Sequence, residues 1–377
     1  MKICVLKSVC PAFDPRIFHK ELPALVKAGH DVTQICPYDK REEVVDGVRL
    51  LGFPARFPVW LRPLNWIRMA SILRREPADV YYFSDPELLP LSLLLTWITR
   101  RPVVYDSFEH YEMLVLTDQR FPALVRPILA RLYGAMETFV AERLAAVVVP
   151  AVDEVDGEKR FHRVRRLVLV RNFAWRDVFS DVPEGAQRKR QLVYIGDISE
   201  SRRGMSTLID MLGLMRNQDV TLLLIGKVDA PRTRAILDEA IARHHVGDRV
   251  RFVEEVPHGT VKFYLWESAV GLVPLRPEPR CEVDIPQKIC EYMACELPFV
   301  ASDLRPPRKF AAESGAGNAV APMSAQAFAD AVDDLLDHPG EAERMGKNGR
   351  RAFLERYNMD EEATRLVELL ESLSPST

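Results

Sequence analysis

The stretch from Ala269 to Asp303 constrains the fold of this chain more than any other part of the sequence. It contains an apolar run at Val270–Leu275, a loop rich in proline and charge, an amphipathic segment at Pro286–Ala294, and a second apolar run at Phe299–Ala301. Short apolar runs bounded by proline and charged residues are typical of buried strands, and the segment between them has helical periodicity. The stretch therefore predicts one strand–helix–strand unit of a parallel sheet.

The same alternation continues along most of the chain. In the first half, the expected strands are residues 2–9, Val32–Cys36, Val48–Leu51, Val80–Phe83, Val103–Tyr105 and Ala146–Val149. In the second half, the strands expected before the opening stretch are Leu192–Ile195, Val220–Ile225 and Val250–Val253. Helical segments separate these runs, which predicts an α/β fold with two doubly wound parallel sheets. Ligands of such sheets bind at the carboxyl ends of the strands.

A polar, charge-mixed segment at Arg176–Arg190 separates the two halves. The chain has 377 residues, and one domain usually has about 100–200, so we expect this segment to be an exposed linker. The prediction is an N-terminal domain over residues 1–175 and a C-terminal domain over residues 176–357. The two sheets are expected to face each other across a deep cleft.

Composition excludes several other classes of protein. The formal net charge of -3 argues against a nucleic-acid-binding protein. Six cysteines show neither CxxC pairs nor a Cys/His metal spacing, which predicts reduced thiols and a cytoplasmic location. The first residues read as a strand rather than a signal peptide, and the apolar run Leu88–Thr99 is too short to span a bilayer.

The loop Gly196–Gly204 follows an expected strand and leads into an expected helix. A helix N-terminus offers free backbone N–H groups, and Arg202 and Arg203 add positive charge, so the loop could bind a diphosphate. It has neither the P-loop spacing nor G-x-G-x-x-G. The alternative is a capped surface helix with two solvated arginines.

Lys288 and Glu291 lie three residues apart on the expected helix of the opening stretch. They could form a surface ion pair. In a doubly wound sheet, however, this helix reaches the same rim as Arg203, Gly226 and the turn 254–259. Arg203 and Lys288 could then bind phosphate, while Glu291 binds the paired hydroxyls of a ribose.

These residues belong to motifs that resemble the family 4 retaining glycosyltransferases of surface-polysaccharide and glycolipid biosynthesis. The motifs are D-P-R-I-F at 14–18, A-G-H at 28–30, S-D-P-E-L-L at 84–89, Y-D-S-F-E-H-Y at 105–111, R-N at 171–172, the loop 196–204, and P-Q-K-I-C-E-Y-M-A-C-E-L-P-F-V-A-S-D at 286–303. The resemblance implies the GT-B fold, with the helix 358–377 returning to the N-terminal domain. It also implies that Glu291 holds the donor ribose and that Arg203 neutralises the departing diphosphate.

The sequence departs from the family pattern at several positions. Val283 stands where the family has the first glutamate of E-x7-E, and Ser84 and Phe108 stand where many relatives have histidines. Glu296 replaces a usual glycine, and residues 10–14 replace a glycine-rich acceptor loop. These departures affect the sugar side of the expected site more than the nucleotide side.

The expected site residues fall into three groups. Catalytic roles are predicted for Arg203, Lys288, Glu109 and His110, although a loop histidine is often merely solvated. Donor binding is predicted for Gly196, Asp197, Arg202, Gly204, Gly226, Lys227, Val256, Pro257, Glu282, Asp284, Ile285 and Glu291. Acceptor binding is predicted for Asp14, Arg16, Ser84, Asp85 and Asp106.

Two segments combine arginines with large apolar residues. These are residues 56–75, with Trp60 and Trp66, and residues 120–131. Basic amphipathic helices that contain tryptophan bind anionic membrane surfaces, which suggests a peripheral association with the inner face of the membrane. The alternative is helices packed on a sheet with their arginines snorkelling outward.

The sequence therefore predicts an enzyme that moves a sugar from a UDP- or GDP-linked donor to a hydroxyl of a glycan or lipid-linked glycan. Retention of configuration is expected from the resemblance. No cofactor or metal is expected, because no D-x-D carboxylate pair lies beside the phosphate site. The alternatives are a sugar-nucleotide epimerase of the same fold and a non-catalytic nucleotide-sugar-binding subunit.

Overall fold

Two parallel sheets organise the chain in the computed structural model, which describes residues 1–54, 63–118, 120–150, 161–181 and 188–373. The chain divides into an N-terminal unit, Met1–Asn172 with Met359–Thr377, and a C-terminal unit, Phe173–Asn358. The sequence placed the corresponding junctions after residues 175 and 357. Within the described ranges, no helix has both the length and the apolar character needed to cross a bilayer.

The sheet of the N-terminal unit has eight strands in the order β3-β4-β2-β1-β5-β6-β7-β8. All its neighbours are parallel except β3 and β4, which form a hairpin through Asp46 and Gly47. Both turn residues have positive φ, 51° and 80°, as a tight hairpin turn requires. The strands are β1 (Lys2–Leu6), β2 (Asp31–Pro37), β3 (Glu42–Val45), β4 (Val48–Phe53), β5 (Val80–Phe83), β6 (Val103–Asp106), β7 (Ala146–Val149) and β8 (Leu167–Leu169).

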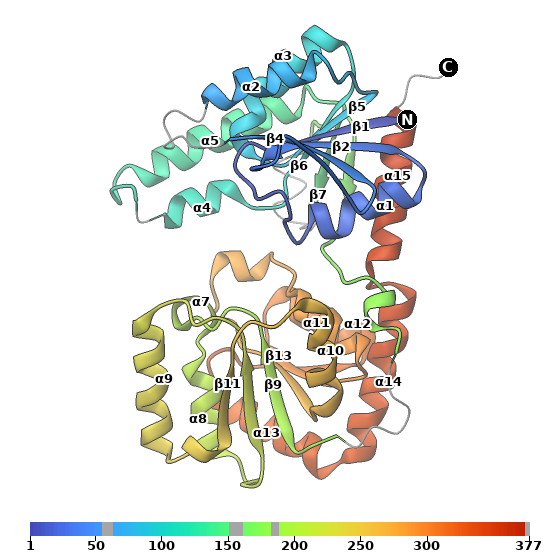
Figure 1. The fold of residues 1–377 in the computed structure, drawn as a ribbon. Helices are drawn as coiled ribbons and strands as arrows, with labels where there is room; N and C mark the ends of the chain where they lie inside the picture. The colour runs from blue at the N-terminus through green and yellow to red at the C-terminus, as the bar shows by residue number, and fades with distance from the viewer. Residues whose placement is uncertain (55–62, 119, 151–160, 182–187, 374–377) are drawn as a thin grey trace. The chain divides into compact units, whose positions relative to one another are not determined.

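Helices cover both faces of this sheet (Figure 1). Three of them, α2, α3 and α5, share one apolar core with alternate residues of the strands, so they form one layer. α15 packs against α1 and β8 and thus belongs to this unit. The helical segments are η1 (Ile17–Glu21), α1 (Leu22–Lys27), α2 (Pro63–Leu73), η3 (Pro86–Leu88), α3 (Leu89–Thr99), α4 (Tyr111–Thr117), α5 (Arg126–Ala141) and α15 (Met359–Leu373).

The sheet of the C-terminal unit has six parallel strands in the order β11-β10-β9-β12-β13-β14. The strands are β9 (Gln191–Ile195), β10 (Thr221–Ile225), β11 (Val250–Val253), β12 (Val270–Val273), β13 (Phe299–Ser302) and β14 (Gly317–Val320). Alternate residues of these strands enter two separate apolar cores, one on each face of the sheet.

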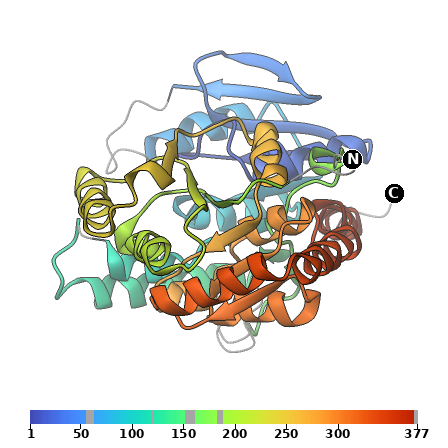
Figure 2. The same cartoon turned by 90° about the horizontal axis from the view of Figure 1, so that it is seen from below.

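Helices bury both of these faces, as the ribbon seen from below also shows (Figure 2). α10, α11 and α12 cover one face, whereas α8, α9 and α13 cover the other. The helical segments are η4 (Asp177–Phe179), α7 (Glu200–Arg203), α8 (Ser206–Leu214), α9 (Pro231–His244), η5 (Gly247–Arg249), α10 (His258–Glu267), η6 (Pro279–Glu282), α11 (Gln287–Ala294), α12 (Arg305–Ser314), α13 (Ala325–Asp337) and α14 (Pro339–Glu355).

Each sheet contains one point at which the strand order reverses. The point lies between β1 and β5 in the N-terminal unit and between β9 and β12 in the C-terminal unit. In open α/β sheets, the loops on either side of such a switch point part and leave a crevice for a ligand. The predicted α/β fold with two doubly wound sheets is confirmed, and its switch points show where to look for the site.

Candidate functional sites at the two switch points

Two glycines line the switch point of the C-terminal unit. Gly196 follows β9 and Gly226 follows β10, with φ of 112° and 144°. A side chain at Gly226 would collide with the carbonyl oxygen of Gly196, and one at Gly196 would lie 3.3 Å from Lys288 Nζ. The glycines therefore let the two turns pack together directly beneath the lysine.

The predicted phosphate loop contains a helical turn, α7, that the sequence analysis did not foresee. Ser199 begins the turn by accepting a hydrogen bond from the Arg202 N–H, at 3.3 Å. Gly204 ends it in the left-handed conformation, with φ of 65°, and a side chain there would collide with Met323. The chain then enters α8, whose N-terminus follows at Ser206.

Arg276 fixes this loop to the end of β12, and the sequence analysis missed it. Its Nε donates to the Glu200 carbonyl oxygen at 2.8 Å, and its Nη2 to the Glu200 carboxylate at 2.6 Å. The same carboxylate accepts from the Ser206 N–H at 2.8 Å. The only signal in the sequence was an arginine placed just after an apolar run.

Arg203 and Lys288 form a pair of cations without a carboxylate partner in the part of the chain that the structure describes. Arg203 Nε is buried and makes no hydrogen bond. Lys288 Nζ lies 3.7 Å from the centre of the Tyr194 ring. Burial, and then the positive charge of Arg203, hold the pKa of Lys288 well below its usual value, while Glu291 and Asp197 oppose the shift. Two mutually repelling cations at a switch point are suited to an anion.

The other residues predicted to bind the donor differ in their burial and in their partners. Glu291 is buried one turn after Lys288 on α11. Arg202 is exposed and forms an ion pair with Asp197 at 3.0 Å, so its charge is already partly neutralised. Lys227 is exposed, and its carbonyl oxygen accepts from the Ile198 N–H at 2.9 Å.

The loop before α11 uses its carboxylates within the protein. Glu282 accepts a hydrogen bond from the Arg305 N–H at 3.0 Å, and Asp284 pairs with Arg280 at 2.6 Å. Val283 between them is buried, and Ile285 packs against the core. Val256 and Pro257 lie between β11 and α10.

At the switch point of the N-terminal unit, Asp85 is a structural carboxylate. Its Oδ2 accepts from the backbone N–H groups of Ser8, Val9 and Cys10, at 2.6, 2.7 and 3.3 Å. The loop that replaces the family's glycine-rich loop is therefore built around this side chain. Asp85 Oδ1 and the adjacent Ser84 Oγ are buried and make no hydrogen bond.

Lys7 and Asp14 form a second buried contact in the same loop. Lys7 is fully buried, and its Nζ pairs with Asp14 Oδ2. Burial lowers the pKa of Lys7 to about 8. Asp14 Oδ1 also accepts from the Ile17 N–H at 2.7 Å and so holds the start of η1. The sequence pattern predicts an acceptor contact for Asp14 and gives no signal for Lys7.

Arg16 and Asp106 bind each other in the core of the unit. The guanidinium donates twice to the carboxylate, at 3.0 and 3.1 Å, and once to the Val170 carbonyl oxygen at 3.0 Å. It also lies 3.0 Å from Glu21, which accepts from the Tyr82 hydroxyl at 2.8 Å. These side chains link η1 to the ends of β5 and β6, and their burial gives them a structural role that the predicted acceptor contacts did not include.

Glu109 and His110 are half-buried at the start of α4. The loop that carries them follows β6, so both residues lie on the carboxyl side of the sheet. They are the predicted catalytic residues of the N-terminal unit.

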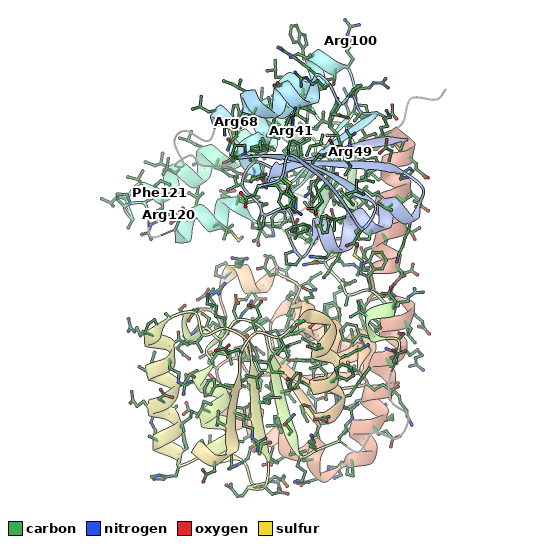
Figure 3. The ribbon with its side chains drawn as sticks, in the orientation of Figure 1. Arg41, Arg49, Arg68, Arg100, Arg120 and Phe121 are labelled. Carbon is green, nitrogen blue, oxygen red and sulfur yellow. The ribbon has the colours of Figure 1, made fainter. Side chains whose placement is uncertain are left out.

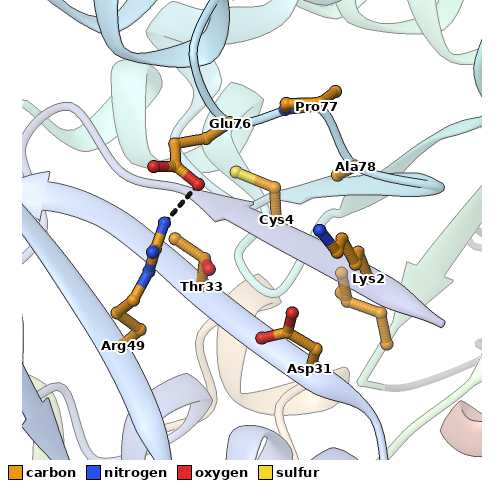
Figure 4. A pocket seen from close by; sticks show the side chains of 9 residues that line it. Lys2, Cys4, Asp31, Thr33, Arg49, Glu76, Pro77 and Ala78 are labelled. Carbon is orange, nitrogen blue, oxygen red and sulfur yellow. Dashed lines mark ion pairs between the residues drawn. The ribbon is translucent and has the colours of Figure 1, made fainter.

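A small cavity in the same unit lies at the other end of the sheet (Figure 4). Residues at the amino ends of β1, β2 and β4 line it, and the Arg49–Glu76 ion pair crosses one side. Its volume of 60 Å³ is far below the roughly 300–1,000 Å³ of small-molecule sites. It is therefore a poor candidate for a substrate site.

Two family models match this chain, one in each unit. Residues 17–172 match the "Glycosyl transferase 4-like domain", and residues 189–338 match "Glycosyl transferases group 1". The chain belongs to the family 4 glycosyltransferases with the GT-B fold.

The chain is also similar to individual glycosyltransferases in sequence and in fold. This glycosyltransferase is 26% identical to alpha-D-kanosaminyltransferase of Streptomyces kanamyceticus over 58% of each chain, so the match spans less than two thirds of that relative. It is 24% identical to phosphatidyl-myo-inositol mannosyltransferase of Mycobacterium leprae, over 79% of this chain and 74% of the relative. The structure of Anabaena HepE in complex with UDP and glucose shares the fold, with a TM-score of 0.73, 16% identity, and coverage of 99% and 100%.

Two departures of this glycosyltransferase from the family pattern have a clear structural setting. Val283 is buried, so an apolar side chain packs where relatives place a glutamate. Glu296 follows α11 with φ of 53°, a conformation that glycine adopts without strain. The first departure puts an apolar side chain where the family pattern has a carboxylate, whereas the second strains the backbone.

Proposed function

We propose that this glycosyltransferase moves a sugar from a UDP- or GDP-linked donor to a hydroxyl of a glycan or lipid-linked glycan, with retention of configuration. The observation that carries the proposal is the pair of cations at the switch point of the C-terminal unit, Arg203 and Lys288, neither of which forms an ion pair within the described residues. The relative that was solved with UDP and the relative named for a phosphatidylinositol acceptor support the donor and acceptor classes.

In this proposal, the enzyme acts mainly through electrostatic stabilisation of the leaving group. Negative charge develops on the diphosphate as the glycosidic bond breaks, and Arg203, Lys288 and the N-terminus of α8 are positioned to stabilise it. Glu291 accepts hydrogen bonds from the ribose hydroxyls. The acceptor hydroxyl attacks from the face that the diphosphate leaves and transfers its proton to the departing phosphate oxygen.

The protein's own cations supply the positive charge, so we propose that the reaction needs no divalent ion. Activity that is lost on treatment with EDTA and restored by Mg²⁺ or Mn²⁺ would contradict this part of the proposal. We also place the enzyme in the cytoplasm, where nucleotide sugars are the donors.

A panel of labelled donors tests the activity. Purified protein is incubated with UDP-glucose, UDP-N-acetylglucosamine and GDP-mannose, with and without a lipid extract, and donor binding, donor loss and acceptor labelling are measured. We expect one donor to bind and to label an acceptor. Failure of every UDP- and GDP-linked donor to bind would contradict the proposal.

One observation favours a second candidate, a non-catalytic nucleotide-sugar-binding subunit. The buried Val283 removes a carboxylate from the sugar side of the site while the cation pair remains. Donor binding with neither donor loss nor acceptor labelling would support this candidate. Donor loss without acceptor labelling would indicate hydrolysis or rearrangement of the donor.

A further inference from the structure

Three helices of the N-terminal unit form one layer whose outer side faces solvent. Residues of α2, α3 and α5 enter the same apolar core on one face of the eight-stranded sheet, and α3 contacts α5 directly. Figure 1 shows these helices together on that face. Because their inner sides all pack on the sheet, their outer sides point away from it on the same side of the unit.

This outer surface is unusually apolar. Its six most informative residues are Ile67 on α2, Leu94, Trp97 and Ile98 on α3, and Ile128 and Leu132 on α5, and we call them the α2–α3–α5 face. Trp97 is 78% exposed, Ile67 67% and Leu132 63%. Water-facing positions of surface helices normally carry polar residues. Large apolar side chains gathered on one exposed side of a unit indicate an interaction site.

Positive charge predominates around the face, although half-buried Glu76 and Glu142 stand just after α2 and α5. The only acid in the described residues of the three helices is Glu137, which is fully buried and accepts hydrogen bonds from Tyr105 and Ser107. Exposed arginines stand within or just after the helices: Arg74, Arg75, Arg100, Arg131 and Arg143. Figure 3 shows Arg68 on α2, Arg100 after α3, and Arg120 with Phe121 before α5, although Arg120 already pairs with Asp118 at 2.6 Å. The whole chain is net negative, at -3, so this positive surface is a local property.

We propose that the α2–α3–α5 face docks on an anionic lipid bilayer, with its apolar side chains in the interface and its arginines at the headgroups. A helix layer with an exposed tryptophan, large aliphatic residues and cations, but no exposed acid, has the chemistry of an interfacial membrane site. A second copy of the chain fits less well, because self-association through this face would bring the same arginines together. The inference depends only on the N-terminal unit and does not require the proposed sugar transfer.

The two segments predicted from the sequence to bind a membrane, residues 56–75 and 120–131, contribute only partly to this face. Arg56, Trp60 and Arg62 lie outside the described residues. Trp66 is partly buried in the core beneath α2 rather than on the outer side. The face instead includes α3, which the sequence analysis did not connect with a membrane.

Vesicle flotation with the full chain tests the proposal. Vesicles of phosphatidylcholine with 30% phosphatidylglycerol are compared with vesicles of phosphatidylcholine alone, and we expect salt-sensitive binding to the anionic vesicles only. The double substitution Trp97→Ser with Ile128→Ser should weaken binding at least tenfold. The matched control Phe263→Ser removes a 55% exposed phenylalanine from α10 in the C-terminal unit and should leave binding unchanged.

The arginines are tested in the same assay. Arg100→Gln and Arg131→Gln should each weaken binding about fivefold, which corresponds to one basic residue at an anionic surface. Arg232→Gln, an exposed arginine of α9, should have no effect. Equal binding to both kinds of vesicle, or none to either, would overturn the proposal. So would a dimer in sedimentation analysis that Leu132→Ser dissociates, because the face would then bind a second copy.

Discussion

The two switch points of this glycosyltransferase both contain buried charged groups but pair them differently. In the N-terminal unit, the charges satisfy one another: Lys7 pairs with Asp14, and Arg16 pairs with Asp106. In the C-terminal unit, Arg203 and Lys288 lie close enough to repel each other, and neither forms an ion pair with a carboxylate of the described residues. A buried charge is tolerated when an opposite charge pairs with it, and it destabilises the fold when it has no partner. Unpaired buried charges are therefore often found at ligand-binding sites.

This difference separates scaffold from binding chemistry. The buried groups of the N-terminal unit fix the loop after β1 and the start of η1, so they leave little for an acceptor. Acceptor recognition is then expected from half-buried residues on other loops, such as Glu109 and His110. Under the proposed function, the C-terminal unit keeps its positive charge available for a diphosphate.

The largest expected effect tests the N-terminal unit. Asp106→Ala leaves Arg16 buried without its main partner and should lower the free energy of unfolding by about 3–5 kcal/mol. The control Asp197→Ala removes an exposed ion pair and should lower it by at most about 1 kcal/mol. Urea denaturation followed by circular dichroism measures both. Similar small losses in the two variants would remove the distinction between the switch points.

The next effect concerns catalysis in the C-terminal unit. Arg203→Gln should reduce kcat by about 100–1,000-fold, because it removes the guanidinium charge that stabilises the leaving diphosphate. The fold should stay intact. Arg202→Gln should cost less than about tenfold, since Arg202 is exposed and already paired with Asp197. Steady-state kinetics with the donor found in the panel gives both values. Equal losses in the two variants would contradict the role assigned to Arg203.

The pH dependence of nucleotide binding sharpens the comparison further. The pKa of free Lys288 lies well below 10.5, and a bound diphosphate should raise it, so binding takes up a proton wherever free Lys288 is neutral. UDP or GDP affinity should therefore fall as the pH rises through the lowered pKa, by up to about tenfold per pH unit. Titration calorimetry from pH 6 to pH 9 measures it. A dependence of the same size in Lys288→Met would assign the effect to another group.

The smallest effect concerns backbone strain. Glu296→Gly should raise the free energy of unfolding by about 1 kcal/mol, because glycine adopts the left-handed conformation that Glu296 is forced into. Glu296→Ala removes the same charge but keeps the strain, so it should give no comparable gain. Urea denaturation of the two variants distinguishes conformation from charge.

The sequence contained enough information for the fold and for the positions of Arg203, Lys288 and Glu291 within it. Strand and helix periodicity are local, and so are the spacings that placed Arg203, Lys288 and Glu291 on loops and helices after strands. Lys7 and Arg276 were missed because their importance depends on partners that only the tertiary structure brings near. Arg276, for example, binds Glu200, which is 76 residues away in the sequence.

The partners of the predicted acceptor residues could not be predicted, for the same reason. Asp85 looked like a loop carboxylate open to a ligand, yet it accepts hydrogen bonds from a loop 77 residues earlier in the chain. Arg16 and Asp106 are separated by 90 residues and meet only through the packing of η1 against the sheet. No local pattern distinguishes a carboxylate that binds substrate from one that is buried against an arginine.

The substitution Lys288→Met tests the central claim most directly, with the free energy of unfolding and UDP and GDP binding measured on the same preparation. If Lys288 is an unpaired cation kept for a diphosphate, removal of its charge should leave the protein at least as stable as the parent. Nucleotide affinity should fall by at least tenfold. A variant that is clearly less stable but binds UDP or GDP as tightly as the parent would contradict the account.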